Sequence, residues 1–258
     1  MSDYQTIRVE QDGFVRRITL ARPDVRNAFN EQVIDELTRA FTSVDEEVRV
    51  VVLAGDGKTF SAGADINWMK KSASYTEAEN ARDASAMRAM FVAIDECRCP
   101  VIVRVHGAAL GGGVGLVAAG DIVVAADDTK FGFTEVRLGI VPAVISPFAL
   151  RKIGVTSARR YFITGEIFKA EEARHIGLIH EIAPADQLDA KIESLVQAIL
   201  QVGPRAAATA KELIRQVTHL GLDNAAEYTV STIAKVRTSS EGQEGLGAFL
   251  EKRQPNWI

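Results

Sequence analysis

The spacing of apolar and polar positions changes character twice within the first fifty residues. Residues 7–20 carry apolar side chains on either side of Asp12-Gly13, a pattern that predicts a β-hairpin with its turn at that dipeptide. From Asn30 onward the apolar positions recur every three or four residues, which predicts an amphipathic helix with Asn30 as its N-cap. The apolar positions of that helix are Val33, Ile34, Leu37, Phe41 and Val44.

Three further apolar runs predict strands that are covered on both faces: VRVVVLAG at 48–55, CPVIVRVHG at 99–107 and DIVVAAD at 121–127. Thr76 and Glu79 have the spacing of a capping box, which predicts a helix running towards Asp95. This alternation of strands and helices indicates an α/β fold with parallel strands and crossover helices. After about Thr156 the segments are mostly helical. We therefore expect a core over residues 1–190 and a helical region over 191–258 that packs on the core or on another subunit.

Composition narrows the class of protein. With 258 residues, 47% apolar positions and a net charge of −4, the chain resembles an ordinary globular enzyme and not a nucleic-acid binder. Cys97 and Cys99 lie one residue apart without metal-site partners, so we expect reduced thiols and no metal. The N-terminus lacks a signal-peptide pattern, and the apolar run at 101–126 is interrupted by charges and glycines. These features predict a cytoplasmic protein without a membrane segment.

A glycine-rich stretch, GAALGGGVGLVAAGD at 107–121, is the first candidate for a functional site. It lacks the Lys and hydroxyl residue of a phosphate-binding Walker loop. Its GVGLVA segment at 113–118 matches a dinucleotide fingerprint, with Glu135 twenty residues beyond Gly115. The glycines could alternatively serve only the close packing of a helix on a sheet.

A third interpretation comes from comparing this stretch with SAGAD at 61–65. Each follows a buried strand and precedes an expected helix, where free backbone N–H groups favour an anion. Two such loops side by side could direct two N–H donors at one oxygen, as in an oxyanion hole.

Among the side chains, Glu135 is the strongest candidate for acid–base chemistry. It lies in the apolar segment FGFTEVRLGIVP at 131–142, and apolar surroundings raise the pKa of a carboxyl group towards the range useful for proton transfer. A surface charge or a partner for Arg137 is the alternative. The four histidines show no ligand spacing, and Ser61 and Ser146 lack a nucleophile-elbow context.

Six motifs in order along the chain resemble the crotonase (enoyl-CoA hydratase/isomerase) superfamily. They are RPDVRNAFN at 22–30, FSAGADI at 60–66, HGAALGGGVGL at 106–116, FGFTEVRLGIVP at 131–142, TGEIFKAEEARHIGLIHEI at 164–182 and AFLEKRQPNW at 248–257. The resemblance implies repeated ββα units forming a superhelix, with a helical C-terminal region used for assembly into a trimer or a dimer of trimers. It also implies an acyl-CoA thioester as the substrate, and no separate cofactor.

The resemblance also implies roles for individual residues. The backbone N–H groups of Ala64 and Gly112 would hold the thioester oxygen, and Glu135 would transfer the proton at the α-carbon. Residues expected to contact coenzyme A are Arg26, Ala28, Ala62, Asp65 and Ile66 in the N-terminal half, with Phe249 and Lys252 near the C-terminus.

Two departures from the family pattern leave the reaction open. Gly115 occupies the position at which the two-acid hydratases carry a second Glu, and VPAVISPFALRKIG at 141–154 replaces a glycine-rich segment. INWM and FTEVRLGIVPAVISP resemble bacterial methylglutaconyl-CoA and carboxygeranoyl-CoA hydratases most. We therefore expect a hydratase for a branched or carboxylated 2-enoyl-CoA. The alternatives are an isomerase that uses Glu135 alone and a weakly active acyl-CoA-binding protein.

Overall fold

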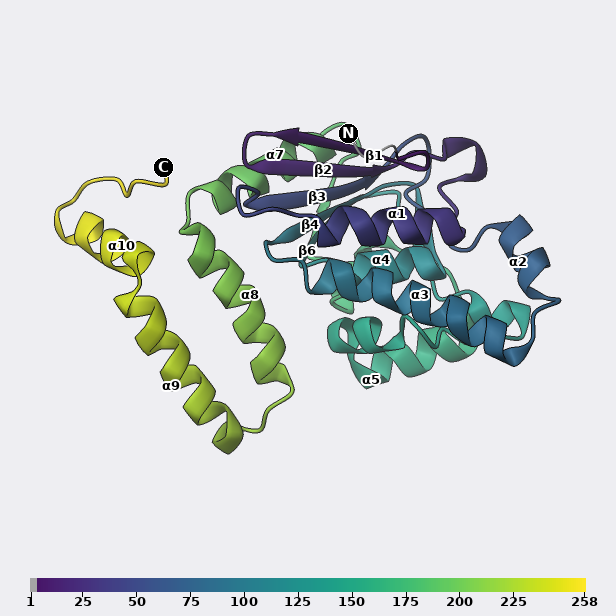
Figure 1. Cartoon of the computed structure of the whole chain (residues 1–258). Helices are drawn as coiled ribbons and strands as arrows, with labels where there is room; N and C mark the ends of the chain where they lie inside the picture. Colours follow the sequence, from purple (N-terminus) through teal and green to yellow (C-terminus); the bar gives the residue numbers. More distant parts are fainter. Residues whose placement is uncertain (1–3) are drawn as a thin grey trace.

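The computed structural model describes residues 4–258, and its main feature is a six-stranded sheet with helices on both faces (Figure 1). The strand order is β1-β2-β3-β4-β6-β9; β1 and β2 are antiparallel and every later neighbour is parallel. The strands of this sheet are β1 (Ile7–Asp12), β2 (Val15–Leu20), β3 (Val50–Gly55), β4 (Val101–Val105), β6 (Ile122–Ala126) and β9 (Glu181–Ala183). The predicted parallel α/β class is confirmed.

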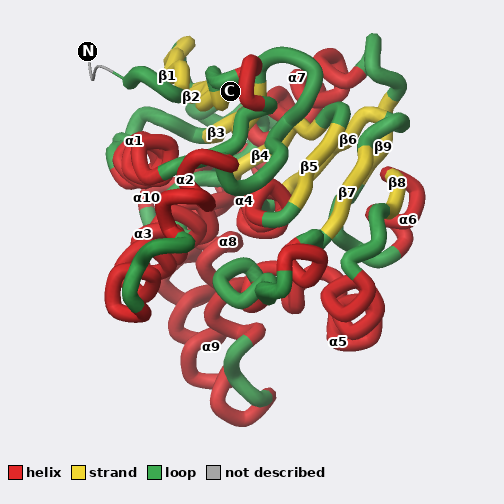
Figure 2. The backbone as a smooth tube through the Cα atoms, turned by 90° about the vertical axis from the view of Figure 1, so that its right-hand side faces the viewer, coloured by secondary structure: helices red, strands yellow, loops and turns green. Residues whose placement is uncertain are grey.

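A second, three-stranded sheet has the order β5-β7-β8. It contains β5 (Ala108–Leu110), β7 (Lys130–Gly132) and β8 (Phe168–Lys169). β4 and β5 are followed by α4 (Gly112–Ala119), and β6 and β7 are followed by the short 3₁₀ helix η2 (Glu135–Leu138) and by α5 (Ser146–Thr164). In these two ββα units the two strands belong to different sheets, so the chain winds between the sheets as it advances (Figure 2).

Helices cover the two faces of the large sheet unequally. α7 (Leu188–Leu200) packs over β3, β4 and β6 on one face and buries Ile192 and Val196 there. The other face carries the larger core, to which α1 (Glu31–Thr42), α3 (Glu77–Asp95) and α4 contribute. The remaining helices are the 3₁₀ turn η1 (Pro23–Val25), α2 (Ile66–Ser72), α6 (Ala170–His175), α8 (Pro204–Thr218), α9 (Leu222–Thr238) and α10 (Ser240–Leu250).

Local signals in the sequence located the element ends well. Asn30 caps α1 by accepting a hydrogen bond from the Val33 N–H at 3.2 Å, and Thr76 and Glu79 form the predicted capping box of α3. The hairpin is also present, although Asp12 pairs with Val15 and the turn lies one residue later than expected.

The glycine-rich stretch contains one element that its composition did not predict. Ala108–Leu110 form strand β5 because they pair with β7, so the loop before α4 is short. The segment that matches a dinucleotide fingerprint, residues 113–118, lies inside α4 and is buried. A dinucleotide site needs its glycines in the turn before the helix, so that interpretation is wrong.

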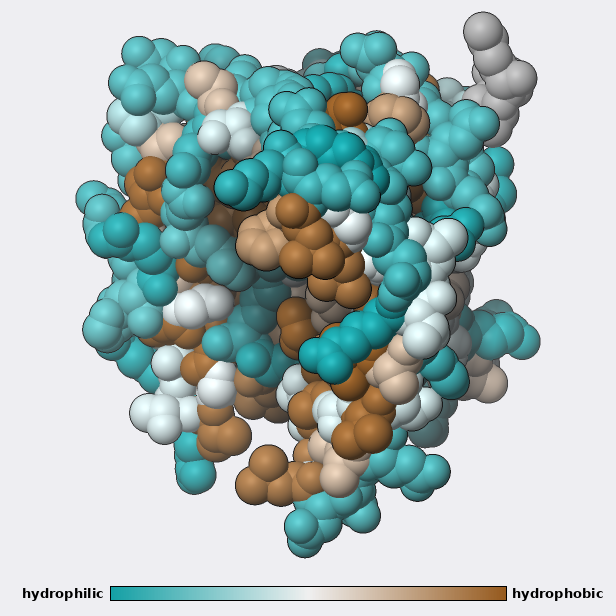
Figure 3. Space-filling view, turned by 90° about the vertical axis from the view of Figure 1, so that its left-hand side faces the viewer, coloured by the Kyte–Doolittle hydropathy of each residue, from teal (hydrophilic) through white to brown (hydrophobic). Residues whose placement is uncertain are grey.

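The C-terminal helices α8–α10 extend away from the sheets (Figure 1). α8 buries none of its residues, and it is tied to the core by an ion pair between Lys211 Nζ and Asp121 Oδ2 at 2.7 Å. Apolar side chains gather in a hollow on this side of the molecule (Figure 3). The exposed apolar residues of these helices are Ile214, Leu222, Val230, Ile233, Leu246, Phe249 and Leu250.

Candidate active site

Two loops at the ends of neighbouring strands are joined by backbone hydrogen bonds. The Ser61 N–H donates to Ala108 O and the Leu110 N–H donates to Ser61 O, each at 3.1 Å. These bonds align the segment that leads to Ala64 with the segment that leads to Gly112. The two loops singled out in the sequence are therefore adjacent in space.

Phe29 contacts both loops at once. Its N–H donates to Gly63 O at 2.8 Å, and its carbonyl accepts from the Asp65 N–H at 3.0 Å, so its backbone brackets Ala64. Its ring lies against Gly112, where a Cβ atom would overlap the ring carbon Cζ. No residue larger than glycine fits at position 112 without moving this ring.

The N–H groups of Ala64 and Gly112 have no hydrogen-bond acceptor within residues 4–258. Both residues line the same cavity, which has a volume of about 310 Å³. Gly112 is also the first residue of α4, where the positive end of the helix dipole favours a negatively charged oxygen. The structure thus brings together two free donors of the kind an oxyanion hole requires.

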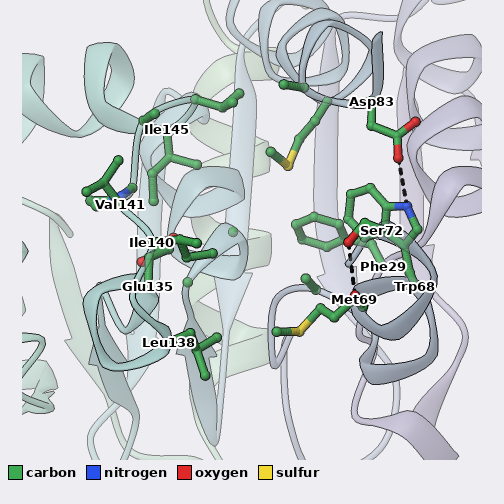
Figure 4. Close-up of a pocket in the computed structure, with 18 of the residues that line it drawn as sticks. Phe29, Trp68, Met69, Ser72, Asp83, Glu135, Leu138, Ile140, Val141 and Ile145 are labelled. Atoms are coloured by element: carbon green, nitrogen blue, oxygen red, sulfur yellow. Dashed lines mark hydrogen bonds between the residues drawn. The ribbon is translucent and has the colours of Figure 1, made fainter. Parts of the chain in front are cut away.

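Glu135 is the first residue of η2 and lies in the same cavity (Figure 4). Its Oε2 is buried and has no hydrogen-bond partner in the described chain, and Oε1 lies 3.5 Å from the place where a Cβ of Gly111 would be. Burial raises the pKa of this carboxyl group, against a smaller opposing effect of its own backbone N–H. No ion pair joins it to Arg137 in the part of the chain described. The predicted apolar setting of Glu135 is confirmed.

The space beside Gly115 is filled. A Cβ at this position would lie 2.7 Å from Phe91 Cζ and would overlap Ile145 Cγ2. The two-acid arrangement is therefore excluded by packing as well as by the residue type at 115. The glycines of this stretch serve two purposes: Gly115 permits close packing of side chains around α4, whereas Gly112 presents a free backbone N–H.

The wall opposite Glu135 comes from α2 and α3 (Figure 4). Trp68 Nε1 donates to Asp83 Oδ2 at 3.2 Å, Ser72 Oγ donates to Met69 O at 3.0 Å, and the Asn80 amide donates to backbone carbonyls. Among the described lining residues, Asp83 and Glu135 are the two charged side chains and neither a Lys, an Arg nor a His is present. The apolar lining includes Phe29, Trp68, Met69, Met87, Leu138, Ile140, Val141, Pro142, Val144 and Ile145.

The residues expected to contact coenzyme A in the N-terminal half lie in one region. Arg26 is exposed in a left-handed conformation with φ 56°, and its carbonyl accepts from the Ala62 N–H at 2.9 Å. Ala28 is buried beside it, and Ile66 is exposed at the start of α2. The Asp65 side chain caps α2 through the Asn67 N–H and pairs with Arg22 at 2.8 Å.

Phe249 lies in the last turn of α10 and Lys252 lies two residues beyond its end, and neither lines the described cavity. Phe249 is 81% exposed, and Lys252 has a left-handed conformation with φ 58°. The fold of one chain therefore leaves these two residues separate from the other site residues.

Sequence reasoning missed Phe29 and did not identify the fillers of the space at Gly115. Phe29 follows Ala28 in the NAF motif, so its neighbourhood was visible, but its contact with Gly112 spans more than eighty positions. Ile145 could have been suspected, because it stands in the bulky segment that replaces the glycine-rich one.

The ββα spiral, the paired free amides and the buried carboxyl group define a crotonase-type enzyme. The chain belongs to the enoyl-CoA hydratase/isomerase family, which it matches over residues 10–258. It is 39% identical to a putative enoyl-CoA hydratase/isomerase (crotonase) from Legionella pneumophila of known structure, with a TM-score of 0.92 and coverage of 99% of this chain and 100% of that one.

Two further relatives support the same assignment. An enoyl-CoA hydratase from Shewanella pealeana of known structure is 38% identical, with a TM-score of 0.94 and coverage of 98% and 96% of the two chains. A probable enoyl-CoA hydratase, echA8, from Mycobacterium tuberculosis is 36% identical over 261 residues and is covered to 98%, as is this chain. The predicted family and fold are confirmed. None of the helices within residues 4–258 combines the length and apolar character needed to cross a membrane.

Proposed function

We propose that this protein catalyses the reversible hydration of a short, uncharged and branched 2-enoyl-CoA. One observation carries the proposal: two unpartnered amides, at Ala64 and Gly112, and one unpartnered carboxyl oxygen, on Glu135, converge on a single apolar cavity. Two of the three relatives described above are named as enoyl-CoA hydratases, and the third is named as a putative enoyl-CoA hydratase/isomerase.

The two amides act on the thioester oxygen. Addition of water at the β-carbon moves negative charge through the conjugated system onto this oxygen, so donors aimed at it are stronger in the transition state than in the ground state. One such donor contributes about 100- to 1000-fold to the rate. The Phe29 ring and the Ser61 backbone hold the donors in place, so little reorganisation is needed during the reaction.

Glu135 serves as both acid and base in this mechanism. Because burial raises its pKa, the protonated form is present at a higher pH than for an exposed Glu. One carboxyl oxygen gives its proton to the α-carbon while the other takes a proton from the water that adds to the β-carbon. The carboxyl group is regenerated, and the product gains one C–H and one C–OH bond.

An isomerase is the second candidate, and the filled space at Gly115 favours it. In that reaction the Glu135 carboxylate takes a proton from the α-carbon of a 3-enoyl-CoA and returns it to the γ-carbon. No water takes part, and the Ser72 hydroxyl and Asn80 amide of the cavity are bonded to backbone carbonyls, which leaves the Thr134 hydroxyl as the lining group that could hold a water for the hydratase.

The choice of an uncharged acyl group depends on the cavity lining. A carboxylated group such as methylglutaconyl would lie near Asp83 and Glu135 without a cation in the described lining. Arg88 nevertheless lines a neighbouring cavity that shares Ala84, Ala143 and Val144 with the acyl cavity. A carboxylate that extends past Val144 would enter the cavity that this arginine lines.

Coenzyme A would lie along two adjacent segments, one that carries Arg26 and one that runs from Ala62 to Ile66. Arg26 is exposed and so available to a phosphate group, Ala62 and Ala64 line the cavity, and Ile66 is exposed beside them. Ala28 and Asp65 are buried within these two segments, and the ion pair of Asp65 with Arg22 joins one segment to the other.

The exposed apolar side chains of α8–α10 support a homo-oligomer, either a trimer or a dimer of trimers. Burying them between copies of this chain removes apolar surface from water, and Phe249 and Lys252 could then reach the coenzyme A of a neighbouring copy. Light scattering on the purified protein tests this: three or six chain masses support it, and a monomer contradicts it.

The deciding experiment follows 2-enoyl-CoA absorbance with crotonyl-CoA, 3-methylcrotonyl-CoA, 3-methylglutaconyl-CoA and a 3-enoyl-CoA as substrates. Loss of conjugation with the uncharged 2-enoyl-CoAs supports the hydratase, whereas gain of conjugation from the 3-enoyl-CoA alone supports the isomerase. Glu135→Gln should reduce turnover at least 100-fold in either case. Asp83→Asn is the matched control and should change turnover less than about fivefold. Undiminished turnover in Glu135→Gln, or binding without turnover in the wild type, would contradict the proposal.

Activity on 3-methylglutaconyl-CoA decides the acyl group. If this substrate is preferred, Arg88→Gln should reduce its kcat/KM while crotonyl-CoA is unaffected. Arg82→Gln, also on α3 but away from the described cavity linings, is the control. If Arg88→Gln still prefers the carboxylated substrate, Arg88 does not recognise its carboxylate.

A further inference from the structure

Beyond the acyl cavity lies a second cavity that the reaction described above does not use. It has a volume of about 240 Å³ and lies between α1 and α3. Trp68 and Asp83 line both cavities, whereas Ala86 and Ala89 line the second one alone. The indole of Trp68 therefore stands between the two spaces.

Trp68 is held in this position by one polar contact. Its Nε1 donates to Asp83 Oδ2 at 3.2 Å, across from Glu135 in the cavity (Figure 4). The helix that carries it, α2, buries none of its own residues. The ion pair between Lys71 and Glu31 that ties α2 to α1 is exposed, and exposed pairs contribute little to stability.

We propose that Trp68, positioned by Asp83, is the end wall of the acyl pocket and sets the maximum length of the acyl chain. The proposal rests on the proposed function in so far as the cavity holds an acyl group. On the near side of the indole the lining is apolar and suits a hydrocarbon chain. On the far side the lining is also mostly apolar, with Ile34, Ala86 and Ala89 beside Glu31, Asp35 and Thr38, so the indole itself and not the polarity of the second cavity is what stops the chain.

The size of the two cavities sets the expected effect. An apolar cavity of about 150 Å³ accommodates a benzene molecule. The acyl cavity, at about 310 Å³, therefore suits a short or branched chain, and joining the second cavity to it adds space for several more carbons. Each additional buried methylene raises affinity about fourfold, until the chain meets a wall.

The test measures binding of saturated straight-chain acyl-CoAs from four to sixteen carbons by calorimetry, together with kcat/KM for the matching 2-enoyl-CoAs. In the wild type, affinity should rise with length and then stop rising. In Trp68→Ala the chain length at which affinity stops rising, hereafter called the break, should increase by about four carbons or more. Met69→Ala is the matched control, because Met69 is on the same helix and lines the acyl cavity alone. It should leave the break within two carbons of its wild-type position.

Three further variants test the wall. Asp83→Leu removes the acceptor for Trp68 Nε1 and should also lengthen the accepted chain, whereas Asp83→Asn keeps an acceptor and should not. Ala86→Trp, placed in the Trp68→Ala background, should fill the second cavity and restore the original limit.

The outcomes separate this proposal from the hydratase. If the protein hydrates no enoyl-CoA but the break moves in Trp68→Ala, the result supports Trp68 as the end wall and contradicts the proposed function. If the protein hydrates an enoyl-CoA but the break is unchanged in both Trp68→Ala and Asp83→Leu, the assignment of Trp68 as the end wall is wrong. A break that moves only when Val144→Ala opens the cavity beside Arg88 assigns the end wall to Val144 instead, and also overturns the proposal.

Discussion

The ring of Phe29 occupies the space that a side chain at position 112 would need, so the presence of this ring requires glycine at position 112. The same Phe29 pairs through its backbone with both neighbours of Ala64. One residue thus sets the position of both amide donors relative to the thioester. A small movement of this ring would displace one donor from the oxygen that it is proposed to bind.

Gly112→Ala should therefore reduce kcat about 100-fold or more, because the new methyl group displaces either the Phe29 ring or the Gly112 N–H. Affinity for coenzyme A should change little, since the contacts proposed for it lie elsewhere. Steady-state kinetics and calorimetry give the two values. Phe29→Ala combined with Gly112→Ala removes the overlap and should recover part of the loss. A Gly112→Ala enzyme of normal kcat would show that this donor is not used.

Ser61 is expected to be a positioning residue. Its buried Oγ donates to Asn27 O at 2.9 Å and accepts from the Gly63 N–H at 3.2 Å, one residue before Ala64. Ser61→Ala should reduce kcat about tenfold with KM nearly unchanged, and it should weaken the shift of the thioester C=O stretch on binding. Thr6→Val removes a buried hydroxyl that bonds to Glu36, far along the chain, and is the control. Equal effects of the two variants on kcat would reduce Ser61 to a stabilising role.

Restoring a carboxylate at position 115 should damage this protein. In Gly115→Glu the side chain would overlap Ile145 and Phe91, and it would bury a charge among apolar groups. We expect the free energy of unfolding to fall by about 3 kcal/mol or more, as measured by denaturant titration. Adding Ile145→Ala should recover part of this loss. A stable Gly115→Glu protein with faster hydration would show that the space adapts easily.

The direction of the pH dependence separates the two candidate reactions. Hydration uses the protonated form of Glu135 to give a proton to the α-carbon, so kcat should fall as pH rises through the raised pKa of this group. Isomerisation begins with the carboxylate, so its kcat should fall as pH decreases through the same pKa. The pH profile of kcat on the preferred substrate measures this, and Glu135→Gln should abolish the dependence.

Stability should also depend on the protonation of Glu135. Because the pKa is raised in the folded state, the contribution of this group to stability is fully present below its unfolded pKa and is lost as pH rises through the folded pKa. Glu135→Gln should therefore raise Tm at pH 8 and leave it nearly unchanged at pH 4. Each unit of pKa shift corresponds to about 1.4 kcal/mol. A variant that is less stable than the wild type at pH 8 would contradict burial as the cause.

The amino-acid sequence determined the local features, because they depend on residues that are close along the chain. Continuous apolar runs that alternate with amphipathic helices predicted the parallel sheet, and Asn30 and Thr76 marked the starts of α1 and α3. The apolar neighbours of Glu135 were enough to predict its setting. The family motifs extended this to a fold and to the expected positions of the two donors.

Tertiary structure alone decided which residues meet across the site. The contact of Phe29 with Gly112 and the filling of the space beside Gly115 by Phe91 and Ile145 join segments distant in sequence. The same is true of the partition that Trp68 makes between two cavities. Local pattern specifies which face of an element is apolar, but the side chain that it meets there depends on how the sheets and helices pack together.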